Sequence, residues 1–266
     1  MAPGITGFSF RMRLKLSRVA LLLAASCGPS DPTLETRTDE RELVVPRAWV
    51  RSVSVTTPAG HPADIYLPRP PRRLRRFFRD AFPVVVILQG ALVDKSQYSG
   101  FAEGIARHGF TVVVPNRLRA VAPGAPPALF TEGAVIADAL ALAEALDDDP
   151  GRFTRRIIDT DQMAITGHSF GGAVGLFVIG ESCGPPLCIL PAPLPEEVRA
   201  AAFYGTNLVQ PPPVGLVDID TGGLPVALLR GTEDGVSTPA ETGDTFTVLD
   251  DGRALITVDG ANHFGI

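Results

Sequence analysis

Residues 162–172 read Gln-Met-Ala-Ile-Thr-Gly-His-Ser-Phe-Gly-Gly, and this stretch decides how the rest of the chain is interpreted. Its first half has the length and apolar character of a buried strand, and the apolar run that follows the glycines predicts a helix. Between the two, residues 167–171 fit the pattern Gly-x-Ser-x-Gly. At a sharp strand-to-helix turn the serine backbone is strained, and flanking side chains would clash unless they are glycine. The pattern therefore predicts an exposed nucleophile, Ser169, in an elbow supported by Gly167 and Gly171.

A serine hydroxyl becomes an effective nucleophile only when a base takes its proton. The chain has four histidines, and only His263 follows Ser169. This order, with His263 just after the last expected strand, matches the order serine, acid, histidine of such sites. We assign His61 to a hairpin, His108 to a helix end and His168 to the elbow, where it points away from its neighbour. His263 is therefore the expected base.

The acid should follow the penultimate strand, which we place at residues 225–231. Glu233 and Asp234 follow it directly, and we expect Asp234 to hold the imidazole of His263, with Glu233 as the alternative. Three later acids are expected to be solvated: Asp244, Asp250 and Asp251.

An oxyanion hole needs two backbone N–H groups. One should come from Phe170, directly after the nucleophile, and the other from the loop after the first buried strand. That loop is Gln89-Gly90-Ala91-Leu92, so Ala91 is the expected second donor. Each such donor typically contributes roughly 100- to 1,000-fold in rate.

Strand-length apolar runs alternate with segments of helical spacing along the rest of the chain. This alternation predicts an α/β fold with a mostly parallel sheet, helices on both faces and an N-terminal β-hairpin. We expect one domain over residues 47–266. The expected hairpin covers 50–55 and 63–67, the strands 83–88, 111–115, 162–166, 200–204, 226–229 and 254–258, and the helices 101–108, 132–146 and 170–179.

Composition narrows the class of protein. The 266 residues carry 24 Lys and Arg against 29 Asp and Glu, a net charge of −5, and 45% are hydrophobic. This much apolar surface excludes disorder as the main state, and the acidic balance argues against nucleic acid as a partner. The three cysteines lack zinc-type spacing, so they do not predict a zinc site.

The N-terminus has the pattern of an export signal. Residues 1–18 are basic, a short apolar run covers 19–25, and small residues precede Cys27. We therefore expect a signal peptide over residues 1–26 and a polar tether over 27–46. Residues 24–27 resemble a bacterial lipobox, which would make Cys27 a lipidation site and the membrane a partner through that anchor. Soluble export is the alternative, and translation could begin at Met12 instead of Met1.

Export would place the protein in the cell envelope or outside the cell, where Cys183 and Cys188 could form a disulfide. A reactive thiol there is the alternative interpretation. The arginine-rich segment 68–80 is expected to be a solvated loop, with contact to anionic lipid headgroups as the functional alternative.

At these motifs the chain resembles the α/β-hydrolases, and more narrowly the group of chlorophyllases, platelet-activating-factor acetylhydrolases and cutinase-like polyester hydrolases. The resemblance covers about residue 47 to the C-terminus, and five pieces carry it: 89–90, 98–116, 167–172, 231–235 and 260–266. It implies hydrolysis of a carboxylic ester through an acyl-serine, without a metal or organic cofactor.

The chain also departs from these relatives. Polyester hydrolases place an aromatic residue where this chain has Ala91, and they carry a tryptophan near the acyl site. The only tryptophan here, Trp49, precedes the first expected strand. An aromatic-polyester clamp is therefore not expected.

Relatives continue into a packed helix, whereas this chain ends three residues after His263. We accordingly expect a fold without that C-terminal helix.

The expected substrate is a small-molecule ester with a small to medium acyl group. The apolar residues expected to line its pocket are Ala91, Leu92, Phe170, Phe203, Tyr204 and Phe264, with residues 184–197 near the entrance. Two other hypotheses stay open at this point: a non-catalytic or truncation-inactivated binding module on the same fold, and acyl transfer from the same acyl-enzyme.

Overall fold

The computed structural model describes residues 49–69, 81–122, 124–151, 154, 156–182, 192–210 and 215–265. The expected signal peptide, the tether, Cys27, Cys183, Cys188 and most of the arginine-rich segment lie outside the described residues and stay predictions. Within the described ranges, no helix has the length and apolar character needed to cross a membrane.

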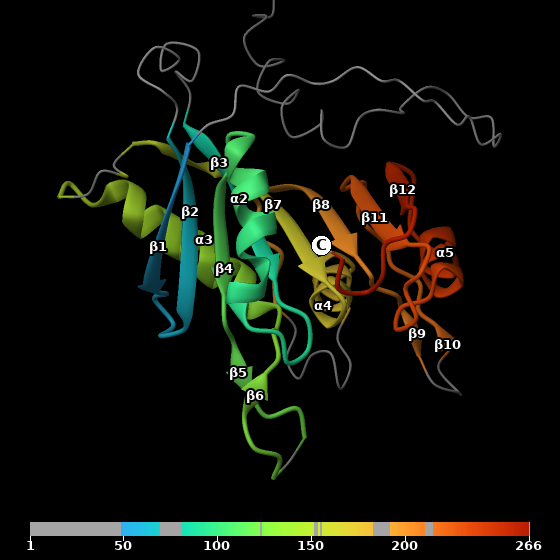
Figure 1. Cartoon of the computed structure of the whole chain (residues 1–266). Coiled ribbons are helices and arrows are strands. Elements are labelled where there is room, and N and C mark those ends of the chain that lie inside the picture. The colour runs from blue at the N-terminus through green and yellow to red at the C-terminus, as the bar shows by residue number, and fades with distance from the viewer. Residues whose placement is uncertain are drawn as a thin grey trace, which may run out of the picture.

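A twisted sheet of eight strands forms the centre of the molecule, in the order β1-β2-β4-β3-β7-β8-β11-β12 (Figure 1). Strand β2 pairs antiparallel with both β1 and β4, and the five remaining pairings are parallel. The strands are β1 (Trp49–Thr56), β2 (Pro62–Arg69), β3 (Phe82–Leu88), β4 (Thr111–Pro115), β7 (Ile158–His168), β8 (Val198–Tyr204), β11 (Val226–Gly231) and β12 (Arg253–Val258). The N-terminal hairpin and the mostly parallel sheet agree with the prediction.

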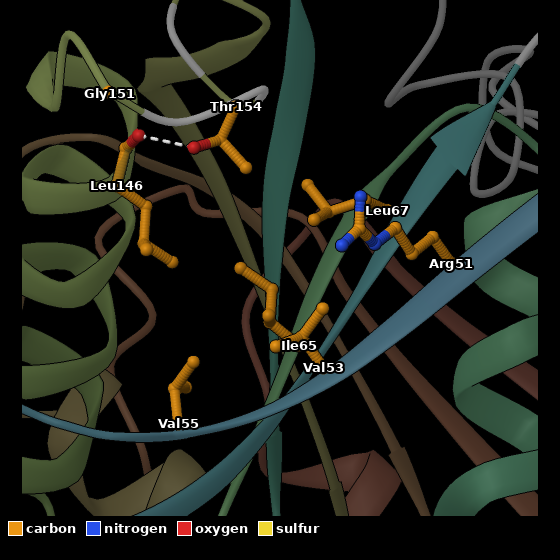
Figure 2. Close-up of a pocket in the computed structure, with 8 residues that line it drawn as sticks. All are labelled: Arg51, Val53, Val55, Ile65, Leu67, Leu146, Gly151 and Thr154. Atoms are coloured by element: carbon orange, nitrogen blue, oxygen red, sulfur yellow. Dashed lines mark hydrogen bonds between the residues drawn. The ribbon is translucent and has the colours of Figure 1, made fainter.

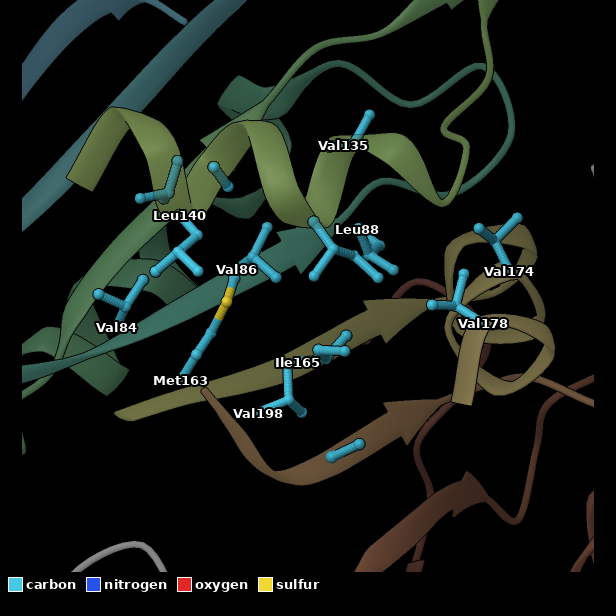
Figure 3. Packing of buried hydrophobic residues seen from close by; sticks show 14 of the residues in the cluster. Val84, Val86, Leu88, Val135, Leu140, Met163, Ile165, Val174, Val178 and Val198 are labelled. Carbon is cyan, nitrogen blue, oxygen red and sulfur yellow. The ribbon is translucent and has the colours of Figure 1, made fainter. Parts of the chain in front are cut away.

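Helices cover both faces of this sheet. They are α2 (Ser99–Arg107), α3 (Ala134–Asp148), α4 (Phe170–Ile179) and α5 (Pro239–Thr247). Because side chains alternate along a strand, β3 serves both faces. Val84, Val86 and Leu88 pack with α3 and α4, as Figure 3 shows, whereas Val85 and Ile87 pack in a second cluster with α2.

The structure adds elements that the hydrophobic pattern did not predict. A 3-10 helix, η2 (Lys95–Tyr98), precedes α2, and two small hairpins pair β5 (Leu118–Arg119) with β6 (Ala128–Leu129) and β9 (Val209–Gln210) with β10 (Gly215–Leu216). Helix α5 was also missed, because it buries mainly threonines, Thr242 and Thr245, instead of an apolar stripe. In Figure 1 the β5–β6 hairpin extends beyond the same end of the sheet at which β7 meets α4.

Candidate active site

The turn between β7 and α4 has the strained geometry of a nucleophile elbow. Ser169 has φ 54° and ψ −123°, in the region that favours glycine. A β-carbon on Gly171 would lie 2.3 Å from the carbonyl oxygen of Leu88, and one on Gly167 would lie 2.8 Å from the Gly171 carbonyl carbon. Any larger residue at either position would force the turn apart, so the two glycines permit the exposed serine.

Three side chains from separate loops meet in one line of hydrogen bonds. The His263 Nε2 lies 2.9 Å from the Ser169 hydroxyl, and the His263 Nδ1 lies 2.9 Å from Oδ2 of Asp234. A carboxylate only accepts, so Nδ1 carries the proton and Nε2 is free to accept one from Ser169. His263 and Asp234 are 5% and 3% exposed, whereas the alternative acid, Glu233, is exposed.

Backbone groups fix the carboxylate of Asp234. Its Oδ1 accepts the N–H groups of Val236 at 2.9 Å and Ser237 at 2.8 Å, and the imidazole Nδ1 lies nearer to Oδ2, at 2.9 Å, than to Oδ1, at 3.1 Å. The acid is thereby held in one rotamer before any substrate arrives. The three later acids, Asp244, Asp250 and Asp251, are exposed as expected.

A glycine that sequence reasoning missed lets the site close. Gly205 follows β8 with φ 55°, and a β-carbon there would lie 3.0 Å from Oδ2 of Asp234 and 3.1 Å from Nδ1 of His263. The preceding carbonyl, that of Tyr204, accepts the N–H of Ser169 at 2.9 Å. The end of β8 therefore supports both the nucleophile and the acid–base pair. The glycine itself, directly after a buried strand, was the available signal.

Three backbone N–H groups of the loop after β3 have acceptors within the protein. The N–H of Gly90 donates to the Tyr98 hydroxyl at 2.7 Å, that of Leu92 to the Leu129 carbonyl, and that of Val93 to the Gly90 carbonyl. Among residues 90–93, Ala91 is the position whose N–H has no acceptor within the described residues. Leu92 in this loop has φ 62°, a conformation uncommon for leucine.

The second expected donor, Phe170, begins α4, where backbone N–H groups have no helical acceptor. Its ring packs edge-on against Phe130 at 5.4 Å between centroids, and the guanidinium of Arg119 lies 5.7 Å from its centroid. The β5–β6 hairpin and the segment after it thus hold this side chain beside the elbow. Sequence reasoning missed both partners, since a two-residue strand has no readable period.

The expected pocket residues divide into two groups. Leu92, in the loop after β3, and Phe264, next to His263, are 66% and 73% exposed. Phe203 was assigned wrongly: it is fully buried, and its ring lies beneath Gly175 of α4, where a β-carbon would come within 2.4 Å of it. Tyr204 is also buried, and its hydroxyl donates to the Asn262 carbonyl.

His168 has a defined place, as expected for a residue that does not serve Ser169 directly. Its Nδ1 lies 3.1 Å from the Tyr98 hydroxyl and its Nε2 lies 2.8 Å from the carbonyl oxygen of His263. Burial, opposed by the bond to the His263 carbonyl, lowers the pKa of the His168 imidazole to about 4. Burial likewise raises the pKa of the Tyr98 hydroxyl to about 12. Both side chains are therefore neutral near pH 7.

This lowered pKa predicts a pH-dependent stability. In the unfolded chain His168 binds a proton below its ordinary pKa of about 6.5, whereas the folded chain binds it only near pH 4. The free energy of unfolding should fall as the pH decreases through this window, by at most about 3 kcal/mol at 1.4 kcal/mol per pKa unit. Urea unfolding from pH 7 to 4.5 measures this fall. A His168→Asn variant should show the largest deficit at pH 7 and a smaller one at pH 4.5, and parallel curves would contradict the assignment.

A cavity at the edge of the sheet is not part of this site. Its lining comes from β1, β2, the C-terminal end of α3 and the turn residues after it: Arg51, Val53, Val55, Ile65, Leu67, Leu146, Gly151 and Thr154 (Figure 2). None of these residues belongs to the elbow or to the loops around it. Within the described residues, no group of three His, Cys, Asp or Glu side chains could hold a metal ion.

Comparison with known proteins relates part of the chain to one family. A family model described as Chlorophyllase matches residues 63–182, the stretch from β2 to the end of α4 that contains the loop after β3 and the elbow. The search of curated proteins found no match. Over residues 63–182 the chain is thus similar to the chlorophyllase family, a family within the α/β-hydrolase superfamily that suggests hydrolysis of esters.

Proposed function

We propose that the protein is a serine hydrolase that cleaves carboxylic esters through an acyl-serine intermediate. The observation that carries this proposal is the continuous set of hydrogen bonds from Asp234 through His263 to Ser169, at 2.9 Å for each step. The chlorophyllase match supports ester hydrolysis. The assignment of the three residues to their roles is our inference from the geometry.

In the first half of the reaction, Ser169 Oγ attacks the ester carbonyl carbon as its proton moves to Nε2 of His263. The oxygen of the tetrahedral intermediate accepts the N–H groups of Ala91 and Phe170, and Asp234 stabilises the imidazolium. The carbon–oxygen bond to the alcohol then breaks, and His263 gives its proton to the leaving alkoxide. Ser169 is left acylated and the alcohol departs.

Water completes the second half by the same route. His263 takes a proton from water, the resulting hydroxide attacks the acyl carbon, and the oxyanion again lies at the two backbone N–H groups. Collapse of this intermediate releases the carboxylic acid, and the proton on His263 returns to Ser169 Oγ. Ser169 Oγ and His263 Nε2 thus supply the proton positions that the cycle needs.

The rim of the site favours an ester with apolar groups of small to medium size. Leu92, Val236 and Phe264 lie within two positions of Ala91, Asp234 and His263, and each is more than 60% exposed. Burying such side chains against a substrate stabilises the complex by about 25 cal/mol per Å² of apolar area. Because these side chains face solvent, they can cover a short acyl chain but leave the far end of a long one in water.

The test is hydrolysis of a p-nitrophenyl ester series from acetate to palmitate, with labelling by a fluorophosphonate. We expect kcat/KM to peak at short or medium acyl chains, and mass spectrometry to find one phosphonyl group, on Ser169. A folded protein that neither hydrolyses any ester nor is labelled would contradict the proposal and would favour a non-catalytic binding module.

A further inference from the structure

A buried line of polar groups runs behind the proposed site and takes no direct part in the mechanism. The Gly90 N–H donates to the Tyr98 hydroxyl at 2.7 Å, the hydroxyl contacts His168 Nδ1 at 3.1 Å, and His168 Nε2 contacts the His263 carbonyl at 2.8 Å. Tyr98 and His168 are each 3% exposed. The line therefore joins the loop that contains Gly90 and the expected oxyanion donor Ala91, the elbow at His168, and the loop that contains His263.

Elementary hydrogen bonding fixes the direction of every bond in this line. The carbonyl of His263 can only accept, so His168 Nε2 carries the imidazole proton and Nδ1 is an acceptor. The Tyr98 hydroxyl must then donate to Nδ1 while its oxygen accepts the N–H of Gly90. With His168 neutral, each donor in this line has an acceptor, and both ring nitrogens of His168 have a partner.

A second tyrosine holds the neighbouring carbonyl of the base loop. The Tyr204 hydroxyl donates to the carbonyl of Asn262, one residue before His263. The rings of Tyr204 and His168 stack at 5.9 Å between centroids with 29° between their planes. Two consecutive carbonyls of a loop without regular secondary structure are thus held by two side chains from adjacent strands, β7 and β8.

The oxyanion loop approaches this line too closely for a side chain to fit. A β-carbon on Gly90 would lie 2.8 Å from His168 Nδ1 and 3.2 Å from the Tyr98 hydroxyl. The backbone of Gly90, which precedes the expected oxyanion donor Ala91, is therefore seated directly on the Tyr98–His168 pair. A displacement of either side chain would be transmitted to the loop through this contact and through the Gly90 N–H.

We propose that Tyr98 and His168 form a positioning relay, which sets the oxyanion loop and the His263 loop relative to Ser169. The inference rests on the proposed function, because it assigns the two residues to the same Ser169–His263 chemistry. Neither touches the reacting atoms: Tyr98 acts through Gly90, and His168 acts through the carbonyl of His263. Transition-state stabilisation depends on donors and base being in place before reaction, so the relay should act on kcat.

The rival interpretation is that this pair only satisfies buried polar groups and stabilises the fold. The two interpretations predict different kinetics. A purely structural pair would lower the unfolding temperature and leave the turnover of folded enzyme unchanged. A relay would lower kcat of folded enzyme, and removal of its second member would add little once the first is gone, because residues in one network are not additive.

The experiment compares Tyr98→Phe, His168→Asn and the double variant in ester hydrolysis, with Tyr66→Phe as the matched control. Tyr66, like Tyr98, is buried in the hydrophobic cluster that packs with α2. It is 4% exposed and lies outside the relay. We expect Tyr98→Phe and His168→Asn each to lose about 10- to 100-fold in kcat, the cost of one or two buried hydrogen bonds. KM should stay within about twofold, the double variant should lose no more than the larger single loss, and Tyr66→Phe should keep its kcat.

A conservative variant tests the direction of the relay. In His168→Gln the amide nitrogen can occupy the position of Nε2 and keep the bond to the His263 carbonyl, whereas in His168→Asn only the acceptor for Tyr98 can be kept. Partial rescue of kcat in His168→Gln relative to His168→Asn is therefore expected. If His168→Asn fails to fold, Tyr98→Phe, which removes a single oxygen, decides alone.

Three outcomes would overturn the inference. Folded Tyr98→Phe with wild-type kcat in an active background excludes the relay and leaves the proposed function standing. Folded wild-type protein without esterase activity and without fluorophosphonate labelling overturns the proposed function, and the relay with it. Fully additive losses in the double variant would also exclude a single relay.

Discussion

Replacement of Ser169 by alanine should lower kcat for p-nitrophenyl ester hydrolysis by about a million-fold, the order of loss seen when a nucleophile of this kind is removed. The loss should be this large because the Ser169 hydroxyl, 2.9 Å from Nε2 of His263, is the nucleophile that forms the acyl-enzyme, and alanine has no hydroxyl to replace it. Any residual rate should come from the oxyanion donors and from binding alone. Initial rates of the purified variant, with wild-type contamination excluded by active-site titration, measure this effect.

The variant should fold normally. Alanine keeps the β-carbon that Ser169 already carries at φ 54°, so the backbone of the turn is no more strained than in the wild type. The Ser169 N–H still donates to the Tyr204 carbonyl. Ser52→Ala, on the exposed surface of β1, is the control and should retain full activity. Esterase activity within tenfold of wild type in Ser169→Ala would refute Ser169 as the nucleophile.

The parts of the site that could be predicted from the sequence are those fixed by topology. Parallel strands end at the same edge of a sheet, so residues directly after β7, β11 and β12 must converge there. Ser169, Asp234 and His263 each follow one of these strands, and the structure joins them by hydrogen bonds. The choice between Glu233 and Asp234 depended on one residue of register, and burial separates the two.

The parts that could not be predicted depend on which way side chains point and on contacts distant in sequence. Phe203 and Tyr204, both assigned to the pocket, are adjacent at the end of β8, so they face opposite sides of the sheet, and Phe203 faces the core under α4. The bonds of Tyr98 to His168 span 70 residues and leave no periodic pattern. Helix α5 did have a local signal: Thr238 and Glu241 form a capping box with Pro239 at the helix start.

Replacement of Asp234 by asparagine should lower kcat by about 10,000-fold without unfolding the protein. The structure gives a specific reason for so large a loss. Oδ1 of Asp234 accepts two backbone N–H groups, at 2.9 and 2.8 Å, so the amide oxygen of asparagine must stay at that position. The amide nitrogen then takes the place of Oδ2 and donates to His263 Nδ1, 2.9 Å away. The imidazole proton is driven to Nε2, where it blocks acceptance of the Ser169 proton.

The adjacent acid provides a matched control for this prediction. Glu233 is exposed, and its contact with the loop of the base is through its backbone N–H, which donates to the Ala261 carbonyl. Glu233→Gln removes the same charge one residue away and should keep kcat within about twofold, because an exposed charge at this distance is screened by solvent and salt. If Glu233→Gln loses as much activity as Asp234→Asn, the effect is one of charge near the site. If only Asp234→Asn is impaired, with normal stability and slow labelling of Ser169 by fluorophosphonate, the imidazole tautomer set by Asp234 controls the reactivity of the serine.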